Sequence, residues 1–183
     1  MVQLSIGGLV LGKLPVIKSI QHGSVSIAEA TASETDTITS VDTNNSLILY
    51  NGKTGNDGNI ANASWFFVRL ELTNSTTVTA TRDEPFEDAV VTYCVIEFYP
   101  GIIKSNQSGS ITMTGTSNTA TINAVNTSKS LLSFLNYTHT EDASMRDTWA
   151  CARMELTNST TVTVTRLSNT GTIIANYQVV EFY

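Results

Sequence analysis

One segment of this chain occurs twice. Residues 65–82 read WFFVRLELTNSTTVTATR and residues 149–166 read WACARMELTNSTTVTVTR, so the copies are 84 positions apart (149 minus 65). The run Glu-Leu-Thr-Asn-Ser-Thr-Thr-Val-Thr is identical in both. Self-similarity at a fixed spacing is the signature of a duplicated structural unit, and it constrains the whole fold more than any local pattern does.

The repeat extends over most of the chain. A closing pattern, Tyr-x-Val-Ile/Val-Glu-Phe-Tyr, recurs at the same spacing in residues 93–99 and 177–183. An opening pattern, Lys-Ser-x-Gln-x-Gly-Ser, begins at Lys18 and again at Lys104, which is a spacing of 86 (104 minus 18). The second copy therefore lacks two residues, and we place the loss in the connection near 28–36.

The repeat sets the domain organisation. We expect an N-terminal arm or extra strand over 1–14, module 1 over 15–99 and module 2 over 100–183. A unit of this size buries only a modest core, so each module should lean on a neighbour. Only Pro100 and Gly101 separate the last strand of module 1 from the first of module 2. Because so short a linker cannot act as a free tether, we expect a fixed interface between the modules.

Residue patterns predict an all-β fold. No window shows the 3.6-residue apolar spacing of a long helix, whereas apolar residues alternate with polar ones at several places, most clearly in 65–72 and 148–157. Asn and Ser in the repeated segment supply a hairpin turn. Strands are expected at 16–27, with a bend or bulge at Gly23, and at 37–41, 46–50, 65–72, 77–81 and 89–99, then at 102–113, 119–125, 130–137, 148–157, 160–166 and 172–183.

Six strands per module with closely spaced turns predict two tandem antiparallel β-sandwiches, or flattened barrels, related by internal duplication. The last strand of module 1 is apolar on both faces near its end, which is typical of a strand covered on both sides. The turn-rich stretch 51–63 and its counterpart 137–147 are expected to be surface loops. These loops differ in sequence, so the modules should share a scaffold but not a surface.

Charge and composition exclude several classes of function. The formal net charge is −6, and the ten Lys and Arg residues do not cluster, so we expect no nucleic-acid binding and no binding to an anionic membrane. The apolar N-terminal stretch has no basic region before it and is interrupted by Gln3, Ser5 and glycines. We therefore expect no signal peptide and synthesis in the cytoplasm of the host, with this stretch packing as an arm against a neighbour.

The two cysteines, Cys94 and Cys151, occupy positions that are not equivalent in the two modules. Each module holds one cysteine, so no disulfide can form within a module. Two buried thiols are the expected state, and a bridge between modules or between chains remains open as the alternative.

No constellation in the sequence points to catalysis, a cofactor or a metal. His22 and His139 are not equivalent, and no zinc-ligand spacing recurs. An acidic cluster, Asp83-Glu84 and Glu87-Asp88, has no counterpart in module 2, so a solvated turn is favoured over a calcium site. We therefore expect a protein that is not an enzyme.

Four residues are candidates for an interface or a glycan contact: Trp65, Trp149, Arg69 and Arg153. Each tryptophan shares the less apolar face of its strand with an arginine and with Glu71 or Glu155. A tryptophan on such a face can stack on a sugar ring, anchor an interface or pack at the edge of the core. The Arg/Glu pairs fit a cross-strand ion pair or a contact between chains.

The opening Lys-Ser-x-Gln-x-Gly-Ser, the central Arg-x-Glu-Leu-Thr-Asn-Ser-Thr-Thr-Val-Thr and the closing Tyr-x-Val-Val/Ile-Glu-Phe resemble repeats in virion proteins of tailed bacteriophages, over residues 15–183. These proteins are assigned to capsid decoration and to tail-fibre or receptor-binding components. The resemblance implies a non-enzymatic, β-rich structural protein of the virion that binds other virion proteins and forms a homo-oligomer, with a trimer favoured.

A second resemblance, architectural only, is to small sugar-binding β-sandwiches of the H-type lectin kind. It implies the alternative function, recognition of a host surface glycan by loops 51–63 and 137–147 and the two tryptophans. No sugar-binding motif of that family can be placed on particular residues of this sequence.

Overall fold

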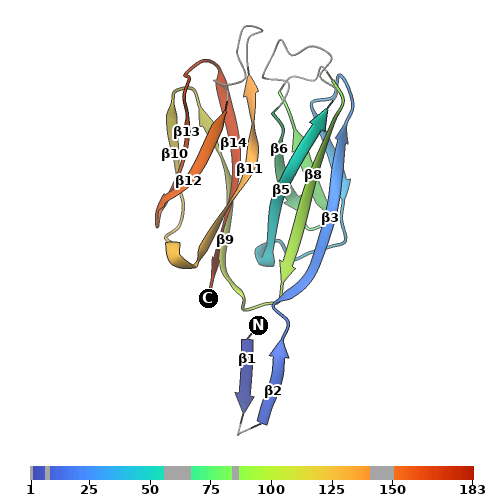
Figure 1. The fold of residues 1–183 in the computed structure, drawn as a ribbon, viewed down its shortest axis with the longest axis vertical. Coiled ribbons are helices and arrows are strands. Elements are labelled where there is room, and N and C mark those ends of the chain that lie inside the picture. The colour runs from blue at the N-terminus through green and yellow to red at the C-terminus, as the bar shows by residue number, and fades with distance from the viewer. Residues whose placement is uncertain (1, 7–8, 56–66, 84–86, 141–150) are drawn as a thin grey trace.

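The chain folds into two β-sandwiches side by side, with an N-terminal hairpin at one end (Figure 1). The structure is a computed structural model, and it describes residues 2–6, 9–55, 67–83, 87–140 and 151–183. Each sandwich has two antiparallel sheets of three strands, so the all-β prediction of two tandem antiparallel sandwiches is confirmed. The sheets are separate, which excludes the flattened barrel.

In module 1, one sheet has the order β3-β8-β5 and the other β4-β7-β6. The strands are β3 (Ile17–Ile27), β4 (Ser33–Thr37), β5 (Ser46–Gly55), β6 (Arg69–Asn74), β7 (Thr77–Thr81) and β8 (Ala89–Phe98). A 3-10 turn, η1 (Thr43–Asn45), precedes β5.

Module 2 repeats this arrangement strand for strand, with sheets β9-β14-β11 and β10-β13-β12. The strands are β9 (Ile103–Met113), β10 (Ser117–Thr121), β11 (Ser130–Thr140), β12 (Ala152–Asn158), β13 (Thr161–Arg166) and β14 (Thr172–Phe182), and η3 (Thr127–Lys129) precedes β11. The connection between the first two strands spans 28–32 in module 1 and 114–116 in module 2, which locates the two missing residues.

The N-terminal segment forms a hairpin of its own, β1 (Val2–Ile6) and β2 (Leu9–Leu14). These strands make a separate two-stranded sheet, and in Figure 1 they extend from the body at the end where β3 begins. An N-terminal arm with strand structure was the expectation for these residues.

Each sandwich has its own core. Both cores are built from the inward residues of the middle strands β8 and β14 and of their neighbours. Val78 and Ala80 of β7, and Val162 and Val164 of β13, are fully buried, while the threonines between them point outward. Alternation with a period of two therefore sets which face of the repeated hairpin is in the core, as the sequence predicts.

Two strand expectations are wrong. The structure has strands at Ser33–Thr37 and Ser117–Thr121, where the sequence is polar, so the expected strands 37–41 and 119–125 overlap them only at residue 37 and at 119–121. Ile38 and Val41 are buried but lie after β4, and their N–H groups donate to the carbonyls of Thr76 and Ser75 in the facing turn. The polar strand β4 is an edge strand, so its pairing with β7 decides its structure and not its burial pattern.

Gly23 is not a bend or bulge, because the pairing of β3 with β8 runs through it without a shift. Instead, the side chain of Tyr93 lies directly against the backbone of β3 at this glycine. A Cβ atom at Gly23 would overlap the hydroxyl of Tyr93, which donates to Asp36 at 2.6 Å. In module 2, a Cβ at Gly109 would lie 2.7 Å from the Tyr177 hydroxyl. Glycine recurs here because a tyrosine ring needs the space.

Two loop expectations also change. Strand β5 continues to Gly55 and β11 to Thr140, so the beginnings of 51–63 and 137–147 are strand and not loop. The remainder of both stretches, 56–63 and 141–147, lies outside the described residues.

Candidate functional site

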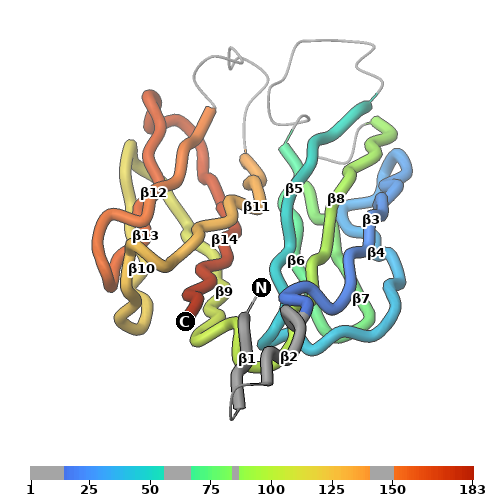
Figure 2. Tube along the Cα trace, turned by 60° about the horizontal axis from the view of Figure 1, so that its bottom comes forward, coloured from blue at the N-terminus to red at the C-terminus, as the bar shows by residue number. Residues whose placement is uncertain are grey.

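The two modules meet face to edge. The outer face of the sheet β9-β14-β11 of module 2 packs on the open side of module 1, where β5 and β6 are the edge strands of their sheets. Figure 2 shows β11 and β14 on one side of this contact and β5 and β6 on the other. This contact is the candidate site for holding the modules in a fixed relation, as the short linker predicts; in the structure the four residues 99–102 join β8 to β9.

Gln178 of β14 takes the place of a neighbouring strand. Its Oε1 accepts the N–H of Ile48 at 2.9 Å, and its Nε2 donates to the carbonyl of Ser46 at 2.8 Å. Because β5 is an edge strand, the N–H of Ile48 would otherwise be buried without this partner, which is costly.

Other polar side chains of the same face extend this pairing along the edge. Ser133 donates to the Ile48 carbonyl at 2.7 Å. Asn106 donates to the carbonyls of Ser46 at 2.7 Å and Thr43 at 2.9 Å, and its own Oδ1 accepts from Gln178 at 2.9 Å. Side-chain amides and a hydroxyl thus satisfy the edge of β5 without adding a strand to the sheet.

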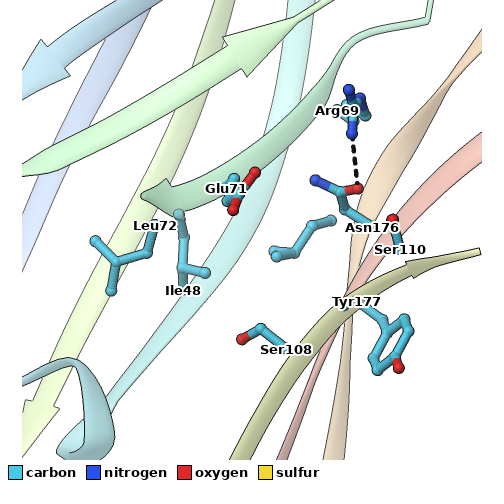
Figure 3. Close-up of a pocket in the computed structure, with 10 residues that line it drawn as sticks. Ile48, Arg69, Glu71, Leu72, Ser108, Ser110, Asn176 and Tyr177 are labelled. Atoms are coloured by element: carbon cyan, nitrogen blue, oxygen red, sulfur yellow. Dashed lines mark hydrogen bonds between the residues drawn. The ribbon is translucent and has the colours of Figure 1, made fainter. Parts of the chain in front are cut away.

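The contact continues from β5 to β6 through Asn176. Its Nδ2 donates to the carbonyl of Leu70 at 3.1 Å, and its Oδ1 accepts from the Arg69 guanidinium at 3.2 Å (Figure 3). A cavity of about 170 Å³ lies beside these residues, lined also by Glu71 and Tyr177. It is smaller than the cavities that usually hold a drug-sized ligand.

Apolar residues cross the same boundary in both directions. Leu135 of β11 belongs to the core of module 1 and is 3% exposed. Phe67, just before β6, packs against the core of module 2, with its ring stacked on that of Tyr137 at 4.3 Å between centroids. Each module therefore supplies an apolar side chain to the other.

This contact is not repeated on module 1, although the fold is. The positions equivalent to Asn106, Gln178 and Ser133 are Ile20, Cys94 and Leu49, which cannot bond an edge strand in the same way. The pairing registers confirm the equivalence, since Cys94 pairs with Leu49 as Gln178 pairs with Ser133. Sequence reasoning missed this site, yet the signal was present in the polar residues that replace apolar ones between the copies.

A second consequence appears on the edge strands of module 2. Ile48 and Leu70 of module 1 are buried beneath the contact, whereas their equivalents Leu132 and Met154 are only half-buried. The edge strands of module 1 are therefore covered by module 2, whereas the equivalent edge strands of module 2 are not covered by module 1 and are more exposed.

A third apolar cluster lies where the modules join near the chain's C-terminus, and we call it the apolar seam. Its buried members are Leu47, Phe98, Ile103 and Val180, and its half-buried members are Val16, Leu49, Ile96, Ile102 and Phe182. The rings of Phe98 and Phe182 meet edge to face with centroids 5.6 Å apart. The apolar second face of the last strands, expected to be covered, is covered here by the other module.

Each module carries the same ion pair between its first and last strands. Lys18 Nζ lies 2.8 Å from Glu97, and Lys104 Nζ lies 2.8 Å from Glu181. Both carboxylates are buried, and each also accepts a backbone N–H, from Asp42 or from Asn126, at 3.0 Å.

These contacts set the pKa of each carboxyl group. Burial acts to raise the pKa of Glu97, but the hydrogen bonds from Lys18 and Asp42 outweigh it and hold the pKa below its ordinary value. The hydrogen bond from Lys104, with that from Asn126, likewise lowers the pKa of Glu181. We assign these ion pairs a structural role, because each one connects the first strand of its module to the last strand.

The last residue of each repeated segment, Arg82 or Arg166, is buried. Arg82 donates to the carbonyls of Ala28, Thr31 and Glu87, and Arg166 donates to those of Gly115, Thr170 and Gly171. Each guanidinium therefore links two connections of its own module: β3–β4 with β7–β8 in module 1, and β9–β10 with β13–β14 in module 2. The sequence shows that the arginine occurs in both copies, but it does not show this role.

The structure separates the four candidate residues. Trp65 and Trp149 lie outside the described residues. Arg69 is in the contact between the modules, bonded to Asn176. Arg153 is at the surface with 75% of its side chain exposed, 3.5 Å from Glu155, in a shallow groove with Leu167. Residues equivalent in sequence thus have different surroundings.

The remaining candidates are placed as follows. Cys94 is buried but Cys151 is exposed, so the expectation of two buried thiols is wrong for Cys151, and no disulfide joins these two described residues. His22 is exposed on β3 and His139 is buried in β11. In the acidic cluster, Asp88 accepts the N–H of Glu29 at 2.8 Å, and Glu84 lies outside the described residues.

Among the described residues, no group of His, Cys, Asp or Glu side chains is arranged to hold a metal ion. No helix in the same part of the chain combines the length and the apolar character needed to cross a membrane. Comparison with protein-family models, curated proteins and solved structures finds no match for this chain.

Proposed function

We propose that this chain is a non-enzymatic structural protein of a phage virion, acting by protein–protein assembly as a capsid decoration protein or as a tail or fibre component. The repeated opening, central and closing motifs support the virion setting through their resemblance to such proteins. The observation that carries the assembly function is the distribution of exposed apolar side chains.

Seven large apolar side chains of the described residues are exposed, and five of them border the apolar seam: Ile17, Ile20, Tyr99, Leu131 and Tyr183. Apolar residues scattered singly over a surface need no explanation, whereas a group at one end indicates an interaction site. Aromatic side chains are also enriched in protein interfaces. This grouping favours a protein whose end surface is covered by other protein.

The virion setting is tested by fractionation of particles from the host that carries this gene. After a density gradient, antibody against the chain is expected to detect it in the particle fractions and to label particles in electron micrographs. Detection only among the soluble proteins at the top of the gradient would contradict the proposal.

The glycan-binding alternative has support from one observation, the exposure of Arg153 beside Leu167, with Cys151 and Ala152 in the same shallow groove. An arginine and an apolar surface together can bind a sugar with an anionic group. Saturable binding on a glycan array that is lost in Arg153→Ala and in Trp149→Ala would favour this alternative. Arg69→Ala is the matched control, since Arg69 is bonded within the contact between the modules.

A further inference from the structure

The apolar seam is incompletely covered within one chain. Five of its members are half-buried, and exposed residues continue it outward. Ile20 pairs with Ile96, and Leu131 pairs with Val180. Tyr183 is 70% exposed at the end of the chain, and its N–H donates to the carbonyl of Ile102. The seam is thus the outer end of the contact between the modules, and it opens to solvent.

The hairpin β1–β2 leaves the body next to this opening. The N–H of Tyr99 donates to the carbonyl of Val16, so the chain enters β3 at the border of the seam. Residues 2–14 hold seven apolar residues and one charged residue, Lys13. The register sets Leu4 opposite Leu11 and Ile6 opposite Leu9. An isolated hairpin is marginally stable in water, so one with this composition needs a surface to cover it.

The hairpin is held away from the seam of its own chain. Only Pro15 and Val16 separate β2 from β3, and Val16 is fixed by its bond from Tyr99. Proline fixes its own φ and keeps the preceding residue, Leu14, extended, and the chain bends at Val16 before β3 begins. In Figure 1 the hairpin accordingly continues away from the two sandwiches.

We infer that the hairpin of one copy covers the apolar seam of a second copy. The occupant has the composition that the seam requires, and both surfaces lie at the same end of the molecule. Each chain carries one hairpin and one seam, so exchange of hairpins satisfies both and closes into a symmetric oligomer. This inference rests on the proposed assembly function and names the surface that performs it.

The first test is the mass of the full chain in solution, by light scattering after size exclusion. Wild type is expected to be an oligomer. Ile20→Asp and Leu131→Asp are expected to shift it to the monomer mass, because covering the seam would remove the hydration of the new carboxylate, and this cost opposes association. Leu167→Asp is the matched control, since Leu167 is 88% exposed in the connection to the start of β14, away from the seam, and it should keep the wild-type mass.

The second test identifies the occupant by disulfide trapping in a Cys151→Ser background, with the buried Cys94 retained. One chain carries Leu11→Cys and a chain of different tagged length carries Leu131→Cys. Mixing them under oxidising conditions is expected to give a disulfide-linked pair of unequal chains. Pairing Leu11→Cys with Leu167→Cys is expected to give none.

The inference is overturned if wild type is an oligomer whose mass the seam variants leave unchanged, or if no unequal pair forms. It is also overturned if the double variant Leu11→Cys/Leu131→Cys closes only within one chain. A monomeric wild type found on particles would overturn the inference and leave the proposed function standing. Absence of the chain from particles, together with a stable oligomer trapped as predicted, would overturn the proposed function and leave the inference standing.

Discussion

Gln178 of module 2 bonds both the N–H of Ile48 and the carbonyl of Ser46 in module 1, across the contact between the modules. A single amide side chain thereby does for the edge of β5 what an added strand would do, without creating a new edge. The relation explains why two small sandwiches pack as one body.

Replacement of this amide should weaken the contact. Gln178→Leu is expected to lower the free energy of unfolding by about 1–3 kcal/mol, because it leaves the buried N–H of Ile48 without this partner, while the Ser46 carbonyl keeps its bond from Asn106. Urea unfolding monitored by circular dichroism measures this loss. The matched control is Gln21→Leu, which removes the same pair of bonds, to the N–H and carbonyl of Thr39, at an exposed site within one module. A loss at Gln178 no larger than at Gln21 would contradict the role assigned to the contact.

Leu135 should contribute to the stability of module 1 although it belongs to module 2. Leu135→Ala is expected to cost roughly 2–5 kcal/mol, the range for a fully buried leucine, since it empties a position in the core of module 1. Hydrogen exchange should show the loss of protection in β5 and β7 as well as in β11. Leu167→Ala, at an exposed leucine, should change stability by less than about 0.5 kcal/mol. Loss of protection confined to module 2 would argue against an exchanged core.

Gly23 should tolerate no side chain while Tyr93 is present. Gly23→Ala is expected to cost about 1–3 kcal/mol, because the new Cβ would overlap the Tyr93 hydroxyl and ring. A double-mutant cycle with Tyr93→Leu measures the coupling, which should recover part of that cost. Gly115→Ala is the control, since a Cβ there meets no atom within 4 Å. Additive effects of the two substitutions would show that Tyr93 is not the obstacle.

Acid should destabilise the fold through the two buried carboxylates. The folded pKa of Glu97 lies below its value of about 4.5 in the unfolded chain, so the unfolded state binds more protons at low pH. Its contribution is complete above pH 4.5 and is lost as the pH falls through the lower folded pKa, and Glu181 behaves in the same way.

The measurement is urea unfolding between pH 7 and pH 3. Wild type should lose stability below pH 4.5, and Glu97→Gln should be less stable at pH 7 but lose less on acidification. Glu155→Gln is the control, because the side chain of Glu155 is 59% exposed and its ion pair with Arg153 is at the surface. Equal acid slopes in wild type and Glu97→Gln would assign the acid sensitivity elsewhere.

The sequence by itself determined the duplication, the all-β class and the inward faces of the repeated hairpins. These follow from regularities that can be read directly in the sequence: a repeat at an offset of 84 residues, alternation of apolar and polar residues with a period of two, and turn residues between Leu72 and Val78. The opening lysine and the closing glutamate recur in both copies and so point to the Lys18–Glu97 and Lys104–Glu181 pairs, although nothing local shows that the two ends of a module are adjacent.

Only the tertiary structure decided how equivalent residues diverge. Arg69 and Arg153 stand at the same place in the repeat, yet one is bonded to Asn176 and the other is at the surface. The physical reason is that the contact joins the face of module 2 to the edge of module 1, so it is heterologous and removes the equivalence of the copies. Which residues become interface depends on that packing, and long-range packing leaves no periodic trace in a single sequence.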